Sequence, residues 1–270
     1  MYRKVFSSPF LLWILGGTLI PLGVIAYYGL TDRSGVFTLG NVAAIFGAEH
    51  AKALWLALLL AFLSTAICLL LALPLSMILR NAAWGRKGFM IFIFILPMWM
   101  NFLLRTMAWQ VLLERGGLIN DILTLLHLPE LQIINTPAAI VLGMVYDYLP
   151  FMVLPVYNAM SRIGNDLIEA AYDLGATKTK VFTSVILPLS VPGIASGITM
   201  VFVPSLTTFA ISNMLGGGKI NLIGNIIEQE FTTVGNWHLG SGLSLVMMIF
   251  IVISMALLSR LDKNGEGVLI

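Results

Sequence analysis

Long runs of apolar residues, separated by short polar stretches, dominate this sequence. A helix needs about 20 mostly apolar residues to cross a bilayer, and six segments reach that length. The runs are continuous and lack the alternation of apolar and polar residues that marks the strands of a membrane barrel. The pattern therefore predicts six transmembrane helices, at about residues 9–30, 52–79, 89–113, 137–160, 191–215 and 240–259.

The composition agrees with a chain embedded in a membrane. Of 270 residues, 59% are hydrophobic and 10% are charged, whereas a soluble domain carries about 25% charged residues. A soluble fold of this length has too little polar surface to cover so much apolar material, and the same composition excludes a disordered chain and a nucleic-acid binder. The single cysteine, Cys68, lies in an apolar run, so neither a disulfide framework nor a thiolate metal site is expected. We therefore expect an all-α, polytopic membrane protein.

The distribution of basic residues predicts the orientation in the membrane, because Lys and Arg concentrate in cytoplasmic loops. With the amino terminus in the cytoplasm, ten of the 15 Lys and Arg residues lie in inside segments and four in outside segments. Both termini are then cytoplasmic. The first segment is a retained helix, since it is too long for a signal peptide and no cleavage pattern follows it. The inside set is Arg3, Lys4, Arg80, Arg86, Lys87, Arg162, Lys178, Lys180, Arg260 and Lys263.

One inside loop, residues 161–190, is long for a compact bundle, and such inserts are usually functional. Asp166 and Glu169 have the spacing of a capping box, and Gly175 supplies a left-handed residue to end the short helix that they begin. A helix this short is marginal in water, so we expect it to dock, either on its own bundle or on a separate cytoplasmic protein. The side chains suited to docking are small or apolar: Ile168, Ala170, Ala171 and Leu174.

The same loop resembles the EAA loop of binding-protein-dependent ABC importer permeases. Further segments are similar to the permeases of spermidine/putrescine importers, most of all to the first of their two permease subunits. Related branches for ferric iron, sulfate or thiamine share parts of the pattern. In the loop, the matching residues are Glu169, Ala170, Ala171, Gly175, Ala176, Phe182, Val185, Leu187, Pro188, Pro192, Gly193 and Ile194, and the further segments are Leu96–Thr106, Gly117–Asn120, Tyr148–Phe151 and Pro204–Gly218.

The resemblance implies a type I importer fold in the bacterial inner membrane, with residues 1–270 as one permease domain. Two permeases would pair above two ATPase subunits, and the resemblance favours a paralogue of this chain as the second permease. An extracytoplasmic binding protein would deliver polyamines. The helix Asp166–Leu174 would be the coupling helix that ATP-driven closure moves as a rigid body. The chain has no GxxxxGK[ST] phosphate loop, so ATP and Mg would bind the partner ATPase and no cofactor this chain. The implied coupling residues are Asp166, Glu169, Ala170, Ala171, Leu174, Gly175, Leu187 and Pro188.

Two ionisable residues, Arg105 and Asp147, fall well inside predicted spans. Charge in a bilayer is expensive and by default indicates a functional site. One interpretation is a mutual ion pair that holds two helices in register. The other is that Asp147 receives a substrate ammonium, with aromatic faces near by in place of water. The candidate pathway residues under this second interpretation are Asp147, Tyr146, Tyr148, Trp99, Asn101 and Arg105.

Two other classes of protein have less support in the sequence. An integral membrane enzyme needs convergent catalytic side chains, but the three histidines (His50, His127 and His238) fall in outer loops without ligand spacing. No catalytic or metal-binding residue is therefore expected. A secondary transporter often contains an internal repeat, and no duplicated half is evident in this sequence. Uptake that depends on ATP rather than on a proton gradient would distinguish an ABC importer from a secondary transporter.

Overall fold

The structure is a computed structural model that describes residues 13–82 and 84–259. Within these residues the secondary structure is helical, apart from an isolated bridge between Thr31 and Phe37. Three helices are long and apolar enough to cross a membrane by themselves, and each matches a predicted span. They are α4 (Ala48–Asn81), α8 (Pro137–Ser161) and α15 (Trp237–Ser259).

Shorter helical segments make up the rest of the described chain. Two bent helix pairs bring the number of spans that length and composition allow to five, and a shorter apolar helix (Leu15–Gly29) lies in the first predicted span. Residues 9–12 of that span and both chain ends lie outside the described residues. The remaining segments are η1 (Leu15–Leu19), α2 (Ile20–Gly29), α3 (Gly40–Ala43), η2 (Ala44–Phe46), α5 (Trp84–Ile95), η3 (Leu96–Trp99), α6 (Phe102–Leu113), α7 (Leu118–Leu125), α9 (Asn165–Asp173), α10 (Lys178–Val181), η4 (Phe182–Ile186), α11 (Leu187–Leu189), α12 (Val191–Thr207), α13 (Ala210–Leu215), α14 (Ile223–Gln229) and η5 (Glu230–Val234).

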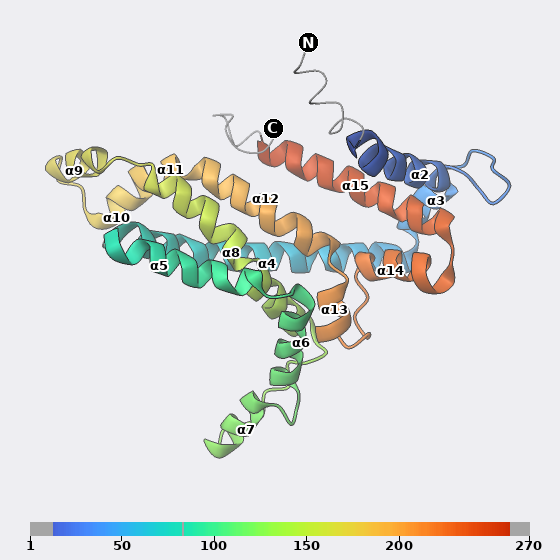
Figure 1. Cartoon of the computed structure of the whole chain (residues 1–270), viewed down its shortest axis with the longest axis horizontal. Coiled ribbons are helices and arrows are strands. Elements are labelled where there is room, and N and C mark those ends of the chain that lie inside the picture. Colours follow the sequence, from blue (N-terminus) through green and yellow to red (C-terminus); the bar gives the residue numbers. More distant parts are fainter. Residues whose placement is uncertain (1–12, 83, 260–270) are drawn as a thin grey trace, which may run out of the picture.

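The helices α4, α8 and α12 form the centre of an elongated bundle, and α2 packs along α15 (Figure 1). Small side chains allow helix backbones to approach closely in a membrane. The hydroxyl of Ser64 donates to the sulfur of Met144 at 3.3 Å, and that of Ser76 donates to the carbonyl oxygen of Val153 at 3.3 Å. The polar groups at this contact between α4 and α8 are thus paired across it. The buried small residues of α4 are Ala53, Ala57, Ala61, Ser64, Thr65, Cys68, Ala72 and Ser76.

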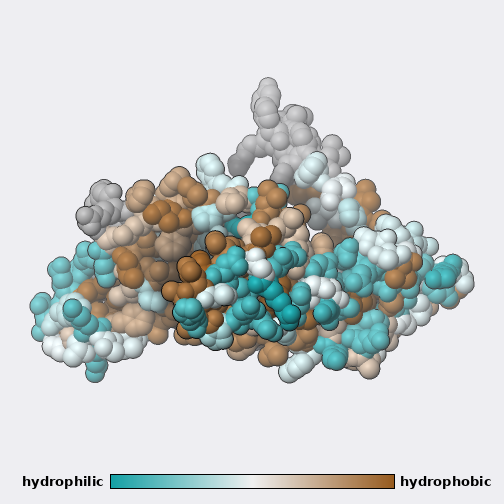
Figure 2. All heavy atoms as spheres, turned by 90° about the horizontal axis from the view of Figure 1, so that it is seen from below, coloured by the Kyte–Doolittle hydropathy of each residue, from teal (hydrophilic) through white to brown (hydrophobic). Residues whose placement is uncertain are grey.

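Close packing of α12 on α8 depends on Gly193. A Cβ atom at this position would lie 2.5 Å from the carbonyl oxygen of Pro155 and 2.5 Å from the Cβ of Ala159. Backbone oxygen cannot move aside as a flexible side chain can, so only glycine permits this approach. On the face shown in Figure 2, hydrophilic side chains lie at both ends of the long axis and also over the middle, with hydrophobic areas between these groups.

The third predicted span, residues 89–113, is broken in the structure. The helical segment ends at Met100, where the backbone is extended (ψ 146°), and the following helices turn by 91°. Pro97 lacks an amide hydrogen, which weakens the helix before the break. Asn101 then restarts it, because its side-chain oxygen accepts hydrogen bonds from the amides of Leu103 (2.9 Å) and Leu104 (3.4 Å). As a result α6 and α7 project sideways from the bundle (Figure 1).

The fifth predicted span, residues 191–215, is also broken. The helix α12 ends at Thr207, the chain is extended at Thr208 (ψ 138°), and α13 begins at Ala210. The fully buried Asn225 of α14 satisfies the interrupted backbone: its amide nitrogen donates to the carbonyl oxygen of Phe209 at 3.1 Å. Irregular backbone at membrane depth is tolerated where protein groups surround it in this way. On the other side, α12 meets the preceding helical run (Lys178–Leu189) at a bend of 66°.

Candidate functional site

The helix expected to couple to an ATPase forms as α9 and lies at one end of the bundle (Figure 1). It begins at Asn165, and the residue before it, Gly164, makes no side-chain cap. The capping box predicted for Asp166 and Glu169 is therefore wrong. Because the N-cap position is Gly164, two residues before Asp166, Asp166 lies in the first turn, where its carboxylate interacts favourably with the helix dipole rather than capping a free amide.

The end of α9 agrees with the prediction. Gly175 has a positive φ of 78°, the left-handed conformation that favours glycine. Its amide donates to the carbonyl oxygen of Tyr172 at 2.8 Å, and the amide of Ala176 donates to that of Ala171 at 3.0 Å. These two bonds form a Schellman motif. The last carbonyl groups of the short helix are satisfied locally, so the helix holds its shape without a partner at that end.

Arg80, at the end of α4, anchors the start of α9. Its Nε donates to the carbonyl oxygen of Met160 at 2.9 Å, and its Nη2 donates to that of Ile163 at 3.0 Å and to Oδ1 of Asn165 at 3.1 Å. One guanidinium thus joins the ends of α4 and α8 to the first residue of α9. From the sequence, Arg80 is recognisable only as one of the basic residues on the cytoplasmic side. Its place in the last turn of a long helix is the sequence signal that could have indicated an anchoring role.

The two faces of α9 have different surroundings. Ile168 and Ala171 pack against the hydrophobic core at this end of the bundle. Leu167 and Leu174 are 50% and 89% exposed, and the exposed Ala170 lies between them. The i, i+3, i+7 spacing of Leu167, Ala170 and Leu174 puts them on one face of the helix. The helix therefore docks on its own bundle through one face and leaves a second apolar stripe open.

Other residues of the predicted coupling set border this stripe or follow it. Asp166, Glu169 and Asp173 are exposed and share an i, i+3, i+7 spacing, so they form an acidic edge beside the apolar stripe. Leu187 is half-buried and Pro188 is exposed, both in the short helix α11 that precedes α12. They are therefore part of the connection to α12 and not of the surface of α9.

Arg105 and Asp147 form the buried ion pair that the sequence suggested. The Nε of Arg105 lies 2.5 Å from Oδ1 of Asp147, and the Asp147 side chain is only 1% exposed. The hydroxyl of Thr106 donates to Oδ2 of Asp147 at 3.1 Å, and Nη1 of Arg105 donates to the carbonyl oxygen of Pro97 at 2.8 Å. The pair thus fixes α6 on α8 and satisfies a carbonyl next to the break in the third span. Both carboxylate oxygens of Asp147 are occupied by protein groups in this conformation.

The other candidate pathway residues are only partly brought together. The Tyr146 ring centroid lies 5.8 Å from Cζ of Arg105, at the edge of cation–π range, and makes an edge-to-face contact with Trp109. Tyr148 is half-buried beside Asp147, whereas Trp99 is 84% exposed. The role of Asn101 is the helix cap described above. Contact of these residues with a substrate stays a prediction.

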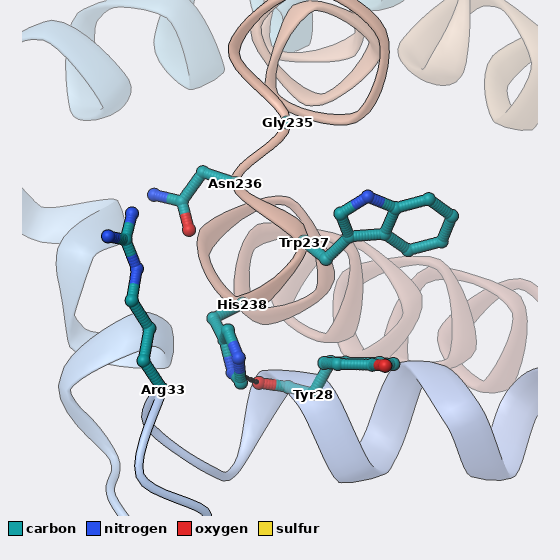
Figure 3. Close-up of a pocket in the computed structure, with 6 residues that line it drawn as sticks. All are labelled: Tyr28, Arg33, Gly235, Asn236, Trp237 and His238. Atoms are coloured by element: carbon teal, nitrogen blue, oxygen red, sulfur yellow. Dashed lines mark hydrogen bonds between the residues drawn. The ribbon is translucent and has the colours of Figure 1, made fainter.

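A cavity of about 320 Å³ lies where the end of α2 meets the start of α15 (Figure 3), and no sequence motif marks it. This end of the bundle is opposite α9 in Figure 1. The Nδ1 of His238 lies 2.7 Å from the carbonyl oxygen of Thr31 and 3.0 Å from that of Tyr28. Both partners are acceptors, so Nδ1 carries the ring proton. Arg33 extends along the same space and forms no ion pair within the described residues.

Comparisons with known proteins define the class of this chain. The family model described as "Binding-protein-dependent transport system inner membrane component" matches residues 40–264. The chain belongs to this family of ABC importer permeases, which are transport components and not enzymes.

Curated relatives narrow the similarity. The chain is 34% identical over 271 residues to the "Spermidine/putrescine transport system permease protein PotB" of Haemophilus influenzae, an alignment that covers 97% of this chain and 94% of that protein. It is also 34% identical over 216 residues to the protein of the same name from Escherichia coli, covering 79% and 78% of the two chains. The "Inner membrane ABC transporter permease protein YdcU" of Escherichia coli is 31% identical over 238 residues, 83% of this chain and 76% of that one.

Solved structures confirm the fold class. A chain of a bacterial ABC transporter involved in the import of alginate superposes with a TM-score of 0.82 at 15% identity, over 98% of this chain and 96% of that chain. A chain of the MetNI methionine ABC transporter gives a TM-score of 0.58 at 20% identity, over 79% and 94%. The predicted all-α membrane fold of a type I importer permease is therefore confirmed, while the count of six spans and the cytoplasmic side of both termini stay predictions.

Proposed function

We propose that this chain is a translocation subunit of an ATP-driven importer of polyamines such as spermidine or putrescine. The full-length similarity to proteins named as spermidine/putrescine permeases supports the substrate class. The observation that carries the transport mechanism is the open apolar stripe of α9, formed by Leu167, Ala170 and Leu174. In this proposal residues 1–270 act as one permease domain with both termini in the cytoplasm.

The stripe of α9 would sit in a cleft of an ATPase subunit. Burial of two exposed leucines supplies an apolar driving force, and the acidic edge of Asp166, Glu169 and Asp173 fits a basic rim on the partner. ATP and Mg bind to the ATPase pair, whose closure moves α9. Arg80 passes this movement to α4 and α8, because its guanidinium contacts both helices and the start of α9.

Two further partners complete the proposed importer. A second permease, a paralogue of this chain, would cover the sideways arm of α6 and α7, whose exposed apolar side chains include Leu103, Leu104, Met107 and Val111. An extracytoplasmic binding protein would dock at the end opposite α9. There Arg33, which has no ion-pair partner among residues 13–82 and 84–259, lies beside the cavity of Figure 3 and suits an acidic side chain on that protein.

Uptake by the complete importer tests the proposed function. We expect vesicles that contain both permeases, the ATPase and the binding protein to take up labelled spermidine when ATP is present. Vanadate should stop the uptake, and collapse of the proton gradient should not. Uptake of ferric iron, sulfate or thiamine in place of spermidine would keep the transport mechanism and contradict the polyamine assignment. Uptake without any ATPase would contradict the mechanism itself.

Changing Leu174 to aspartate is expected to release the ATPase. Leu174 is 89% exposed, so the variant should fold and insert normally. Burying a leucine is worth about 1.5–3 kcal/mol, and a charge at its place adds a desolvation penalty, so capture of the ATPase should fall at least ~10-fold. Affinity-tag pull-down from detergent measures this effect. The matched control is Thr179→Asp, an exposed position of α10 outside the stripe; equal losses in both variants would contradict the assignment.

A further inference from the structure

A groove of about 510 Å³ lies between α2, α12, α14 and α15, toward the end of the bundle opposite α9 (Figure 1). Its walls are largely apolar and include two aromatic rings, Phe209 and Phe231, and two methionines, Met247 and Met248. Glu228 is the only ionisable side chain in the lining. A lone carboxylate in such surroundings is unfavourable unless a cation or several donors compensate it.

The protein supplies little of that compensation to Glu228. The hydroxyl of Thr232 lies 3.1 Å from Oε1 of Glu228, but it is closer to the Glu228 carbonyl oxygen, at 2.8 Å. Within the described residues, Oε2 of Glu228 has no hydrogen-bond partner and the carboxylate has no ion-pair partner. The groove therefore presents one acceptor oxygen for a cationic group.

A second carboxylate lies two residues further along the same turn of chain. Oε2 of Glu230 is buried and has no hydrogen-bond partner in the described part of the structure. Glu230 opens the π-helical turn η5 that follows α14, and π-turns occur frequently at functional sites. Glu230 does not line the groove itself, but an unsatisfied buried oxygen in a native fold calls for a missing partner.

The aromatic rings of the groove are held in fixed positions. Phe231 makes an edge-to-face contact with Trp237, with ring centroids 5.5 Å apart, and a Cβ at Gly240 would lie 3.1 Å from Cζ of the ring. Phe209 lies at the break between α12 and α13, where its carbonyl oxygen is bound by Asn225. Ring faces attract ammonium groups within about 6 Å. A metal ion would instead need more oxygen ligands than this one carboxylate offers.

We propose that this groove is a binding site for an aliphatic ammonium. The ammonium group contacts Oε2 of Glu228 and the faces of Phe209 and Phe231, and the alkyl chain lies along Met247 and Met248. The walls suit methylene groups and the carboxylate suits the charged end, which is the chemistry of a polyamine. The inference rests on the proposed function and adds a site at which the permease itself holds the substrate after the binding protein releases it.

The test compares variants in the complete importer reconstituted in vesicles with saturating binding protein. Glu228→Gln keeps the size of the side chain and removes the charge. We expect it to lower the rate of spermidine uptake per assembled complex about tenfold, and to weaken binding of labelled spermidine to the complex without binding protein by a similar factor. The matched control, Glu130→Gln, neutralises an exposed acid outside the groove and should leave both values unchanged.

The outcomes separate this inference from the proposed function. In one outcome the wild-type importer takes up spermidine while Glu228→Gln shows uptake and binding within twofold of wild type. This result contradicts the groove as a binding site and leaves the polyamine assignment standing. A wild-type importer that neither binds nor carries a polyamine overturns both. If Glu228→Gln does not assemble, Phe231→Leu takes its place: it keeps an apolar side chain and loses the ring face, so spermidine binding should weaken about threefold. If Phe231→Leu binds spermidine as the wild type does, the groove is not the ammonium site, and an acyl chain of lipid is then its occupant.

Discussion

Valine in place of Gly175 is expected to disconnect the permease from its ATPase while leaving it in the membrane. Gly175 has a φ of 78°, which a residue with a Cβ adopts at a cost of about 1–2 kcal/mol, and more when the side chain is β-branched. A Cβ there would meet no atom within 4 Å, so the effect comes from the backbone and not from a clash. The Schellman bonds would open, and Leu174 would leave the stripe of α9.

Capture of the ATPase and stimulated ATP hydrolysis measure this effect, and we expect each to fall about tenfold. The control is Gly175→Asn, because asparagine enters the left-handed region several-fold more readily than other residues. It should keep most of the coupling. A valine variant that binds and stimulates the ATPase as the wild type does would show that the shape of this helix end does not matter, and would contradict the assignment of α9.

The sequence predicted the parts of the fold that depend on local signals. The long apolar runs of α4, α8 and α15 appear within a few residues of the expected bounds, because continuous apolar length is what a membrane helix requires. The stop of α9 at Gly175 was also predictable, since a left-handed glycine acts within a single turn. Belonging to the importer permeases followed from the EAA loop for the same reason, as its residues are consecutive or nearly so.

The breaks and the start of α9 depend on distant partners and were not predictable in this way. The chain stays largely apolar around Met100 and Thr208, and the distant residues Arg105 and Asn225 bind the carbonyl oxygens next to the two breaks. The capping box at Asp166 had correct local spacing, but the N-cap position of α9 is Gly164 and the helix starts at Asn165, whose side chain Arg80 binds from 85 positions away. The groove at Glu228 likewise needs four helices, none of which marks it alone.

The largest loss of stability is expected from removal of Arg105. Arg105→Ala would leave the Asp147 carboxylate, 1% exposed, without a cation and the carbonyl oxygen of Pro97 without its donor. Breaking a buried ion pair by removing one partner typically costs about 3–5 kcal/mol. Asp147→Asn should be milder, because an amide oxygen can still accept from the guanidinium. Thermal unfolding and the yield of folded protein in detergent measure both effects.

The double variant Arg105→Met with Asp147→Leu then separates the two interpretations of Asp147. Replacing both charges with apolar side chains of similar volume is often neutral for stability, so the double variant should recover most of what Arg105→Ala loses. If the pair only holds α6 on α8, spermidine uptake should recover with stability. If Asp147 also receives a substrate ammonium in another conformation, the double variant should be stable and slow. A double variant as unstable as Arg105→Ala would contradict the ion pair as the reason for that loss, because no buried charge would then remain unpaired.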